Sequence, residues 1–306
     1  MNGETNIVTN LINQIIKNNE DQIFFTKDEE IVINKYTDFY HLKVNEKIKN
    51  FNYLDPDSLI FMNDGYAEID DDGYPFDDIE VKNFILNTKY KNFKYQVALY
   101  KQLLDFAKIK NNNDIKVLVD IGCGKGGGVS FYKNFYNFDY CIGIDLTRVN
   151  IDVAKKHEKK VNFFIASATN LPINDNTVDV ITSVESIFYY DPMSKFAQEA
   201  FRVLKDNGKL LISADLTEKQ EKIMEDTFLN NGLVLYDKKN ITKNVRMGCC
   251  ISKSRFMDIS FSESIIMSND ETKYFGENKT FKQYKNFIFI KKENNYAKIW
   301  LQMFCL

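Results

Sequence analysis

The middle of the chain contains five short apolar runs, and between the last two of them lies a stretch whose apolar residues recur at helical spacing. Each run is nearly continuous in apolar residues, which is typical of strands covered on both faces in a parallel sheet. The helical stretch, Phe196–Lys205, ends at the turn-forming residues Asp206-Asn207-Gly208. Strands that alternate with helices predict a doubly wound, Rossmann-like and mostly parallel α/β sheet. The predicted strands of this region are Val117–Asp120, Tyr140–Asp145, Val161–Ala166, Thr177–Ser183 and Lys209–Asp215.

The two ends of the chain extend this pattern. Residues 5–35 carry apolar side chains on one helical face, and a helix over Lys89–Lys108 leads into the first strand. On the C-terminal side we expect a helix over Glu218–Asn230. Strands over Leu233–Tyr236 and Phe287–Ile290 then complete a seven-stranded sheet.

Residues 241–285 are too long to be a simple connection between the last two strands. They contain a predicted helix, Ile241–Met257, and a polar, aromatic stretch around Tyr274. We interpret this insertion as part of a substrate lid. The predicted organisation is a helical N-terminal cap (1–110), a nucleotide-binding core (111–240), a lid insertion (241–285), and a last strand with the tail (286–306).

A glycine-rich turn follows the first predicted strand. Glycine lets the backbone turn sharply and lets a ligand approach the main-chain amides closely. Gly122, Gly124 and Gly127 form the dinucleotide pattern G-x-G-x-x-G. Together with Asp120, residues Gly122, Gly124 and Gly126 also form D-x-G-x-G-x-G, which resembles the first motif of class I S-adenosylmethionine (SAM) methyltransferases.

Two acids help to choose between these cofactors. Asp120 would repel the pyrophosphate of NAD but favour the ammonium and sulfonium groups of SAM. Asp145 ends the second strand 21 residues beyond Gly124, the spacing at which a carboxylate meets ribose hydroxyls. Asp145 suits either cofactor, and it also suits a helix N-cap.

Two further segments resemble class I methyltransferases. Ser167-Ala168-Thr169-Asn170-Leu171-Pro172 resembles the segment G-D-A-x-x-L-P-F that reads the adenine edge, with Ser167 in place of the acid. Residues 202–215 match the block R-V-L-K-x-x-G-x-L-L-I-S-x-D, which NAD dehydrogenases lack at this place. The chain is therefore similar to class I SAM-dependent methyltransferases of the small-molecule type, which act on polyketides, lipids and sterols.

This resemblance implies a cofactor site made from the glycine-rich loop and the ends of neighbouring strands. Tyr66 matches a tyrosine that closes over the cofactor in those enzymes. The cofactor-binding candidates are Asp120, Gly122, Gly124, Gly126, Asp145, Leu146, Ser167, Ala168, Thr169, Val184 and Tyr66.

The acceptor is expected beside the loop that follows the fourth strand. Phe188 stands where related enzymes often carry a histidine. The acceptor's proton therefore falls to Glu185, Asp215, His41 or a tyrosine such as Tyr189, unless no strong base is needed. Glu185 also suits a contact with the SAM ammonium, and Asp215 suits a helix cap. The substrate-binding candidates are Phe188, Tyr190 and Tyr274.

Composition argues against several other classes of protein. A net charge of −3 argues against nucleic acid as the main partner. The longest apolar stretches are too short for a membrane span, and residues 1–4 lack the pattern of a signal peptide, so we expect neither. Five cysteines without a C-x-x-C pair favour a cytoplasmic protein with reduced thiols, and two histidines argue against a metal site. A homodimer is left open.

We therefore expect a SAM-dependent methyltransferase that acts on a small organic acceptor. O-methylation of a polyketide-like or phenolic metabolite is the first hypothesis. C-methylation of an isoprenoid or sterol is the nearest alternative, because a pocket of carboxylates and aromatic rings can stabilise a carbocation. A non-catalytic SAM-binding partner subunit and an NAD enzyme are the alternatives from other classes.

Overall fold

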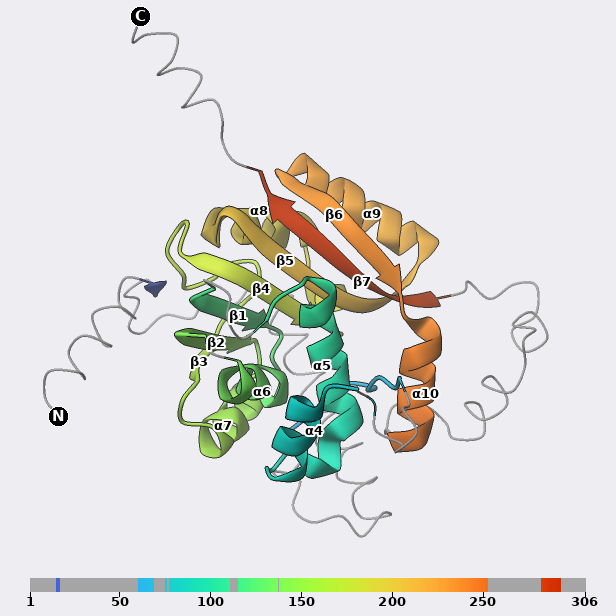
Figure 1. Ribbon diagram of the computed structural model, residues 1–306. Coiled ribbons are helices and arrows are strands. Elements are labelled where there is room, and N and C mark those ends of the chain that lie inside the picture. Colours follow the sequence, from blue (N-terminus) through green and yellow to red (C-terminus); the bar gives the residue numbers. More distant parts are fainter. Residues whose placement is uncertain are drawn as a thin grey trace, which may run out of the picture.

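A seven-stranded sheet with the strand order β3-β2-β1-β4-β5-β7-β6 forms the centre of the protein (Figure 1). The computed structural model describes residues 15–16, 60–68, 75, 77–110, 115–136, 138–252 and 282–292. The strands are β1 (Val117–Ile121), β2 (Tyr140–Asp145), β3 (Asn162–Ile165), β4 (Val178–Val184), β5 (Leu204–Thr217), β6 (Leu233–Asn240) and β7 (Lys282–Lys291).

The sheet is mostly parallel, as the sequence predicted. β1 pairs in parallel with β2 and β4, β3 extends the sheet from β2, and β5 pairs in parallel with β4. Only β7 runs antiparallel to its neighbours, between β5 and β6. Parallel strands end at the same edge of a sheet, so the loops after β1, β2, β4 and β5 meet there.

Helices cover both faces of this sheet (Figure 1). One face packs against α5, α6 and α7 through residues such as Leu104, Phe131 and Ile151. The other face packs against α8 and α9 through Phe196 and Phe228. The helices are α4 (Ile79–Leu86), η3 (Lys91–Phe93), α5 (Lys94–Phe106), α6 (Gly127–Phe135), α7 (Arg148–His157), η4 (Ile187–Tyr189), α8 (Met193–Val203), α9 (Glu218–Asn230) and α10 (Thr242–Ser252).

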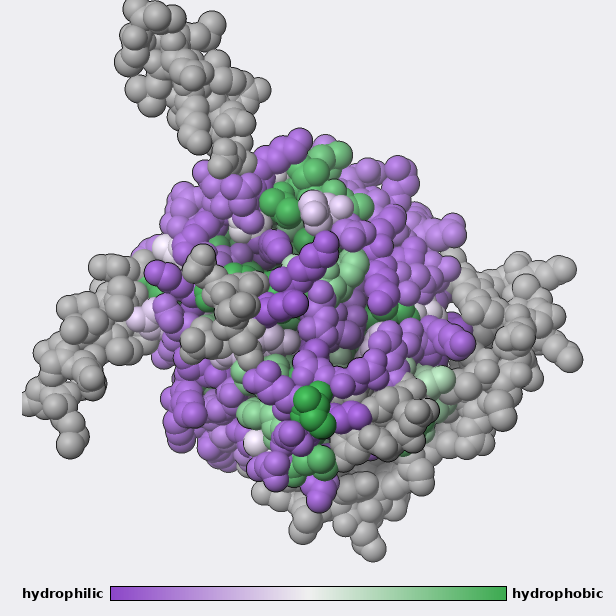
Figure 2. Space-filling view, viewed as in Figure 1, coloured by the Kyte–Doolittle hydropathy of each residue, from purple (hydrophilic) through white to green (hydrophobic). Residues whose placement is uncertain are grey.

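The surface in the view of Figure 2 is mostly hydrophilic, with apolar residues in separate small groups. None of the helices in the described part of the chain combines the length and the apolar character that a bilayer crossing requires.

Several element boundaries differ from those predicted. β5 begins at Leu204 rather than Lys209, but its pairing with β4 skips residues 205–208, where Asn207 has a left-handed φ of 64°. β6 continues to Asn240 and β7 begins at Lys282, so both are longer than the apolar runs that predicted them. α9 has the predicted bounds, and α10 falls within the helix predicted for the insertion.

The predicted helix over residues 5–35 lies almost wholly outside the described residues. Where the chain is described, Ile15 is helical and Ile16 forms an isolated antiparallel bridge with Ile173. The adjacent Ile15 is buried against the core. His41 and Tyr274, with most of the predicted lid, lie outside the described residues.

Candidate cofactor and acceptor site

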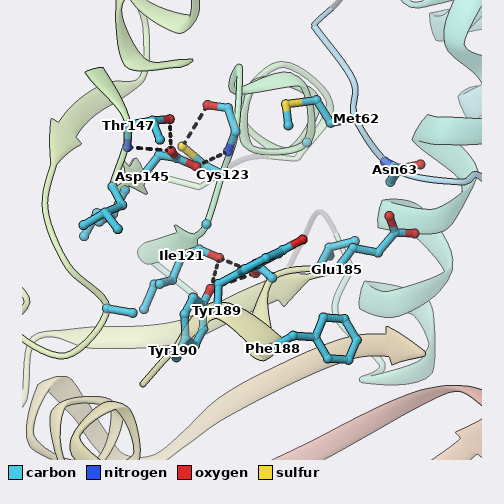
Figure 3. Close-up of a pocket in the computed structure, with 18 of the residues that line it drawn as sticks. Met62, Asn63, Ile121, Cys123, Asp145, Thr147, Glu185, Phe188, Tyr189 and Tyr190 are labelled. Atoms are coloured by element: carbon cyan, nitrogen blue, oxygen red, sulfur yellow. Dashed lines mark hydrogen bonds between the residues drawn. The ribbon is translucent and has the colours of Figure 1, made fainter. Parts of the chain in front are cut away.

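A cavity of about 650 Å³ opens at the carboxyl edge of the parallel strands. Its walls come from the loops after β1, β2, β3 and β4, from the end of β5, from the middle of α5, from the start of β7 and from residues 60–64 (Figure 3). This is the edge at which open α/β sheets bind ligands. Segments far apart in the sequence therefore share one site.

The glycine-rich loop forms one end of the cavity. Gly122, Gly124 and Gly126 have φ values of 69°, 54° and 79°, a left-handed region that other residues rarely adopt. A Cβ on Gly122 would lie 2.4 Å from the Ser186 Cβ, and one on Gly124 would lie 2.8 Å from the Met62 sulfur. The glycines are thus required by the loop's own packing as well as by any ligand.

Asp145 holds this loop in shape. Its Oδ2 accepts the Gly124 N–H at 2.8 Å. Its Oδ1 accepts the Thr147 N–H at 2.9 Å and the Thr147 hydroxyl at 2.6 Å. The predicted ribose-binding carboxylate is therefore already oriented by the backbone around it, and it lines the cavity.

Asp120 lies behind the loop, in the middle of the sheet. It is 1% exposed, and its Oδ1 accepts the Thr182 hydroxyl at 2.7 Å. Oδ2 has no hydrogen-bond partner among the described residues. Burial raises the pKa of Asp120 to about 7, while the Thr182 hydrogen bond opposes that shift. A buried, half-satisfied carboxylate suits a cationic ligand group, reached directly or through water.

The segment after β3 forms another wall of the cavity. Ser167, Ala168 and Thr169 line the cavity together with Leu146. The Ser167 Oγ accepts the Thr169 N–H at 3.0 Å and lies 2.7 Å from the Thr169 hydroxyl. This turn presents hydroxyls and main-chain groups, which are suited to the polar edge of a heterocycle.

Glu185 marks the other end of the cavity, directly after β4. Its backbone is left-handed, with a φ of 54°, which is a strained position for a residue other than glycine. Its Oε1 accepts the Tyr284 hydroxyl at 2.7 Å and the Asp64 N–H at 3.1 Å. Burial, with the nearby Asp64 charge, raises the pKa of Glu185 to about 8. Glu185 is therefore placed to exchange a proton near neutral pH.

Aromatic rings surround this acidic end. Phe188 and Tyr189 of η4 are exposed at the cavity, with the Lys282 ammonium 5.5 Å from the Phe188 ring centre. Asp215 also lines the cavity, and its pKa is raised by burial, against the nearby Lys282 and Arg246. This end is suited to an acceptor with an aromatic or extended apolar body.

Tyr190 lies deeper than the other two rings (Figure 3). Its hydroxyl donates to the Ile121 carbonyl at 2.8 Å and lies close to the Ser186 hydroxyl, and its ring packs against Phe196. These contacts hold the β4 loop against β1. Tyr190 lines the cavity, but its hydroxyl is engaged within the protein.

Most of the predicted site residues meet at this cavity, but three of the cofactor candidates do not line it. Tyr66 is buried in the core, where its hydroxyl donates to Glu68 at 2.5 Å, so its ring does not contact the cavity. Asp120 lies behind the loop and Gly126 lies at its far side, where a Cβ would meet Phe163. Val184 lines the cavity next to Glu185.

Sequence reasoning missed two residues that contact Glu185. Asp64 comes from the segment before α4, and Tyr284 comes from β7. Asp64 lies two residues before Tyr66, in the segment that resembles related enzymes, but only Tyr66 was singled out there. Tyr284 lies in no recognisable motif. The one available signal is Tyr284 itself, a large aromatic residue in the otherwise polar stretch Lys282-Gln283-Tyr284-Lys285-Asn286.

Comparison with known proteins gives a domain and a fold. Residues 119–212 match the family model described as a methyltransferase domain. The fatty-acid O-methyltransferase of Mycolicibacterium smegmatis is 27% identical over 160 residues, which cover 52% of this chain and 53% of that protein. The erythromycin 3''-O-methyltransferase of Saccharopolyspora erythraea is 32% identical over 37% of this chain and 38% of that protein. The chain thus spans about half, or less, of the length of these relatives.

The solved structures extend the likeness beyond the matched domain. Geranyl diphosphate C-methyltransferase from Streptomyces coelicolor A3(2) covers 87% of this chain and 98% of its own, with a TM-score of 0.60 and 17% identity. The [4+2]-cyclase SpnF covers 89% of this chain and 99% of its own, with a TM-score of 0.58 and 14% identity. At such identities the likeness concerns the fold, and a cyclase among these neighbours shows that the fold alone does not name a reaction.

The order of the strands and the match to the domain model agree on one assignment. The predicted resemblance to class I methyltransferases and the seven-stranded fold are both confirmed, because the matched residues run from β1 to β5 and include the whole glycine-rich loop. Residues 119–212 therefore form a methyltransferase domain, within a chain that has the fold of class I SAM-dependent methyltransferases.

Proposed function

We propose that this protein binds SAM in the cavity and transfers its methyl group to a hydroxyl of a small, aromatic or polyketide-like acceptor. One observation carries the proposal. The same cavity has the Asp145-braced glycine loop at one end and the partly buried Glu185 among aromatic rings at the other. A nucleoside cofactor and an acceptor would therefore meet within one enclosed space.

The residues present are compatible with SAM rather than NAD. SAM supplies a methyl group that is already activated by its sulfonium charge. Asp145 would hold the ribose hydroxyls, and the turn at Ser167–Thr169 would face the adenine edge. Asp120 does not line the cavity, but its buried carboxyl group lies directly behind the glycine-rich loop, where its charge favours a cationic cofactor over a pyrophosphate.

Glu185 would take the proton from the acceptor hydroxyl. It lines the cavity, and its raised pKa brings its proton affinity close to that needed at neutral pH. Phe188 and Tyr189 would hold the acceptor body and exclude water from the transfer. The remaining catalytic demand is alignment, because the methyl donor needs no further activation.

C-methylation is a second candidate function, and the composition of the acceptor end favours it. The rings of Phe188 and Tyr189 and the carboxyl groups of Glu185 and Asp215 line the same end of the cavity. Such a pocket stabilises a carbocation formed when an alkene accepts a methyl group. Mass spectrometry of products from paired phenolic and alkenyl acceptors would separate the two reactions.

A thermal-shift titration with SAM, S-adenosylhomocysteine and NAD tests the proposal. A ligand at one hundred times its Kd stabilises the native state by about 2.7 kcal/mol, so SAM and S-adenosylhomocysteine should raise the Tm by several degrees. Asp145→Asn should lose most of that increase, whereas Asp152→Asn, an exposed acid on α7, should keep it. Stabilisation by NAD alone, or by no ligand at millimolar concentration, would contradict the proposal.

A further inference from the structure

Strand β7 carries buried polar residues on the face that meets the site. Tyr284 is 5% exposed and Asn286 is 0% exposed. They are two positions apart and therefore project from the same face of the strand. Phe287 and Phe289 pack into the core of the opposite face. Burying polar side chains is costly unless they are hydrogen bonded, so the partners of these two residues show what they hold in place.

Tyr284 is fixed through its main chain as well as its side chain. Its N–H donates to the Thr242 hydroxyl at 2.9 Å, and its carbonyl accepts the Ile241 N–H at 2.8 Å. The start of α10 is thereby joined to β7 at this residue. The Tyr284 hydroxyl then donates to the Glu185 Oε1 at 2.7 Å.

Asn286 fixes the same strand two residues further along the chain. It pairs with Ser213 of β5, whose hydroxyl donates to the Asn286 Oδ1 at 2.7 Å. The Asn286 amide donates to the Gln102 Oε1 at 2.6 Å, which joins β7 to α5. The backbone that carries Tyr284 is thus held against β5, α5 and α10, so its hydroxyl has little freedom to move.

The two oxygens of Glu185 are treated differently. Both hydrogen bonds that Glu185 accepts within the described part of the chain, from Tyr284 and from the Asp64 N–H, go to Oε1. The Glu185 N–H donates to the Ser213 carbonyl at 2.8 Å, which fixes the backbone from which the side chain projects. Oε2 is therefore the oxygen left for a group in the cavity.

We propose that Tyr284 is a positioning residue that anchors Oε1 of Glu185 and so presents Oε2 to the acceptor's proton. This inference rests on the proposed function, in which Glu185 takes that proton. The phenol hydroxyl stabilises the ionised carboxylate by a charge-assisted hydrogen bond and fixes its direction. Tyr284 itself neither gains nor loses a proton in this role.

The ionisable groups around Glu185 determine how its titration responds. Asp64, from the segment before α4, and Asp215, at the end of β5, disfavour its negative charge. The hydroxyls of Tyr100 on α5 and Tyr189 on η4 also lie within its electrostatic reach. The hydrogen bonds from Tyr284 and from the Asp64 N–H act in the opposite direction and lower the pKa. Removing the Tyr284 hydroxyl should therefore raise the pKa of Glu185.

The test is a carboxyl titration that needs no acceptor. The protein is labelled with glutamate enriched in carbon-13 at the carboxyl carbon, and the signal lost in Glu185→Gln identifies Glu185. In Tyr284→Phe, the midpoint of that signal should move to higher pH by about one unit, the equivalent of one charge-assisted hydrogen bond. Tyr236→Phe, an exposed tyrosine on β6, is the matched control and should leave the midpoint unchanged.

An unchanged midpoint in a folded Tyr284→Phe protein would overturn the inference. SAM affinity, measured by calorimetry on the same proteins, separates this failure from failure of the proposed function. Wild type that binds no SAM would refute the function, whereas a Tyr284→Phe protein that binds SAM with an unshifted Glu185 would refute only the positioning role. Equal SAM affinity together with a shifted midpoint supports both.

Discussion

Glu185 combines two costly features, a left-handed backbone and a partly buried carboxylate. Its folded pKa of about 8 lies above the ordinary value, so the folded protein keeps a proton that the unfolded chain loses. Stability should therefore fall as pH rises from the unfolded pKa toward 8. Strain and unfavourable charge at one residue are typical of functional sites.

Glu185→Gln should for this reason stabilise the protein. Glutamine keeps an oxygen for the Tyr284 hydroxyl and the Asp64 N–H but carries no charge. The gain in unfolding free energy should be small at pH 5 and reach about 1–2 kcal/mol at pH 8. Thermal melts of both proteins across this range measure it. If the difference in unfolding free energy between the two proteins stayed constant with pH, Glu185 would not titrate between pH 5 and pH 8.

The rate of methyl transfer should have the opposite pH dependence to stability. At pH 7, one unit below its pKa, about a tenth of Glu185 is ionised and able to accept a proton. The single-turnover rate with an alcohol as acceptor, whose hydroxyl does not ionise in this range, should thus increase about tenfold between pH 7 and pH 9. A flat profile in wild type, or a rising profile in Glu185→Gln, would assign the proton transfer to another group.

At the scale of elements, the glycine-rich loop and α6 depend on contacts that no motif contains. Gly128 follows the D-x-G-x-G-x-G motif, yet a Cβ there would lie 2.0 Å from the Tyr100 ring. Gly128→Ala should force α5 and α6 apart and destabilise the protein by about 1–3 kcal/mol. Denaturant unfolding measures this, and Tyr100→Leu in the same protein should restore part of the loss. Additive losses in the double variant would exclude the clash as the cause.

The sequence predicted those elements whose apolar pattern is complete. β2 and α9 have the predicted bounds, and β1 exceeds its predicted run by one residue, because continuous apolar runs and a capped helix are local signals. β7 begins five residues before its apolar run, in the polar stretch from Lys282 to Asn286. That stretch is a strand because it pairs with β5, a contact distant in sequence. Tyr284 was missed with it, as was Asp64.

The cofactor end of the site was more predictable than the acceptor end for a related reason. Gly122, Gly124 and Asp145 belong to a single β–α–β unit formed by β1, α6 and β2, where spacing fixes the geometry. Glu185 follows the same logic at the end of β4. Its partners do not, because Asp64 lies 121 positions before it and Tyr284 lies 99 positions after it. Contacts of this kind are set by the topology of the whole sheet.

The whole molecule gathers carboxyl groups at the acceptor end of the cavity. Asp64 comes from before α4, Glu185 from the end of β4, and Asp215 from β5. Lys282 is the basic side chain among the described residues that line the cavity, and its ammonium lies over the Phe188 ring. Above pH 8, where Glu185 is mostly ionised, the fold therefore opposes an anionic acceptor more than a neutral one, whatever the acceptor's shape.

This charge distribution predicts the class of acceptor. Between a phenol and a benzoate with the same ring substituents, the phenol should have the higher kcat/KM by about tenfold, equivalent to about 1.4 kcal/mol of repulsion. Asp215→Asn should narrow that ratio by removing one acid, whereas Lys282→Gln should widen it by removing the base. Competition assays with mixed acceptors measure the ratio directly. A preference for benzoate would contradict this prediction. It would show that the positive charge of Lys282 outweighs the negative charge of the three acids in the electrostatic potential at the transferred methyl group. The acceptor would then have to bind against the Phe188 ring.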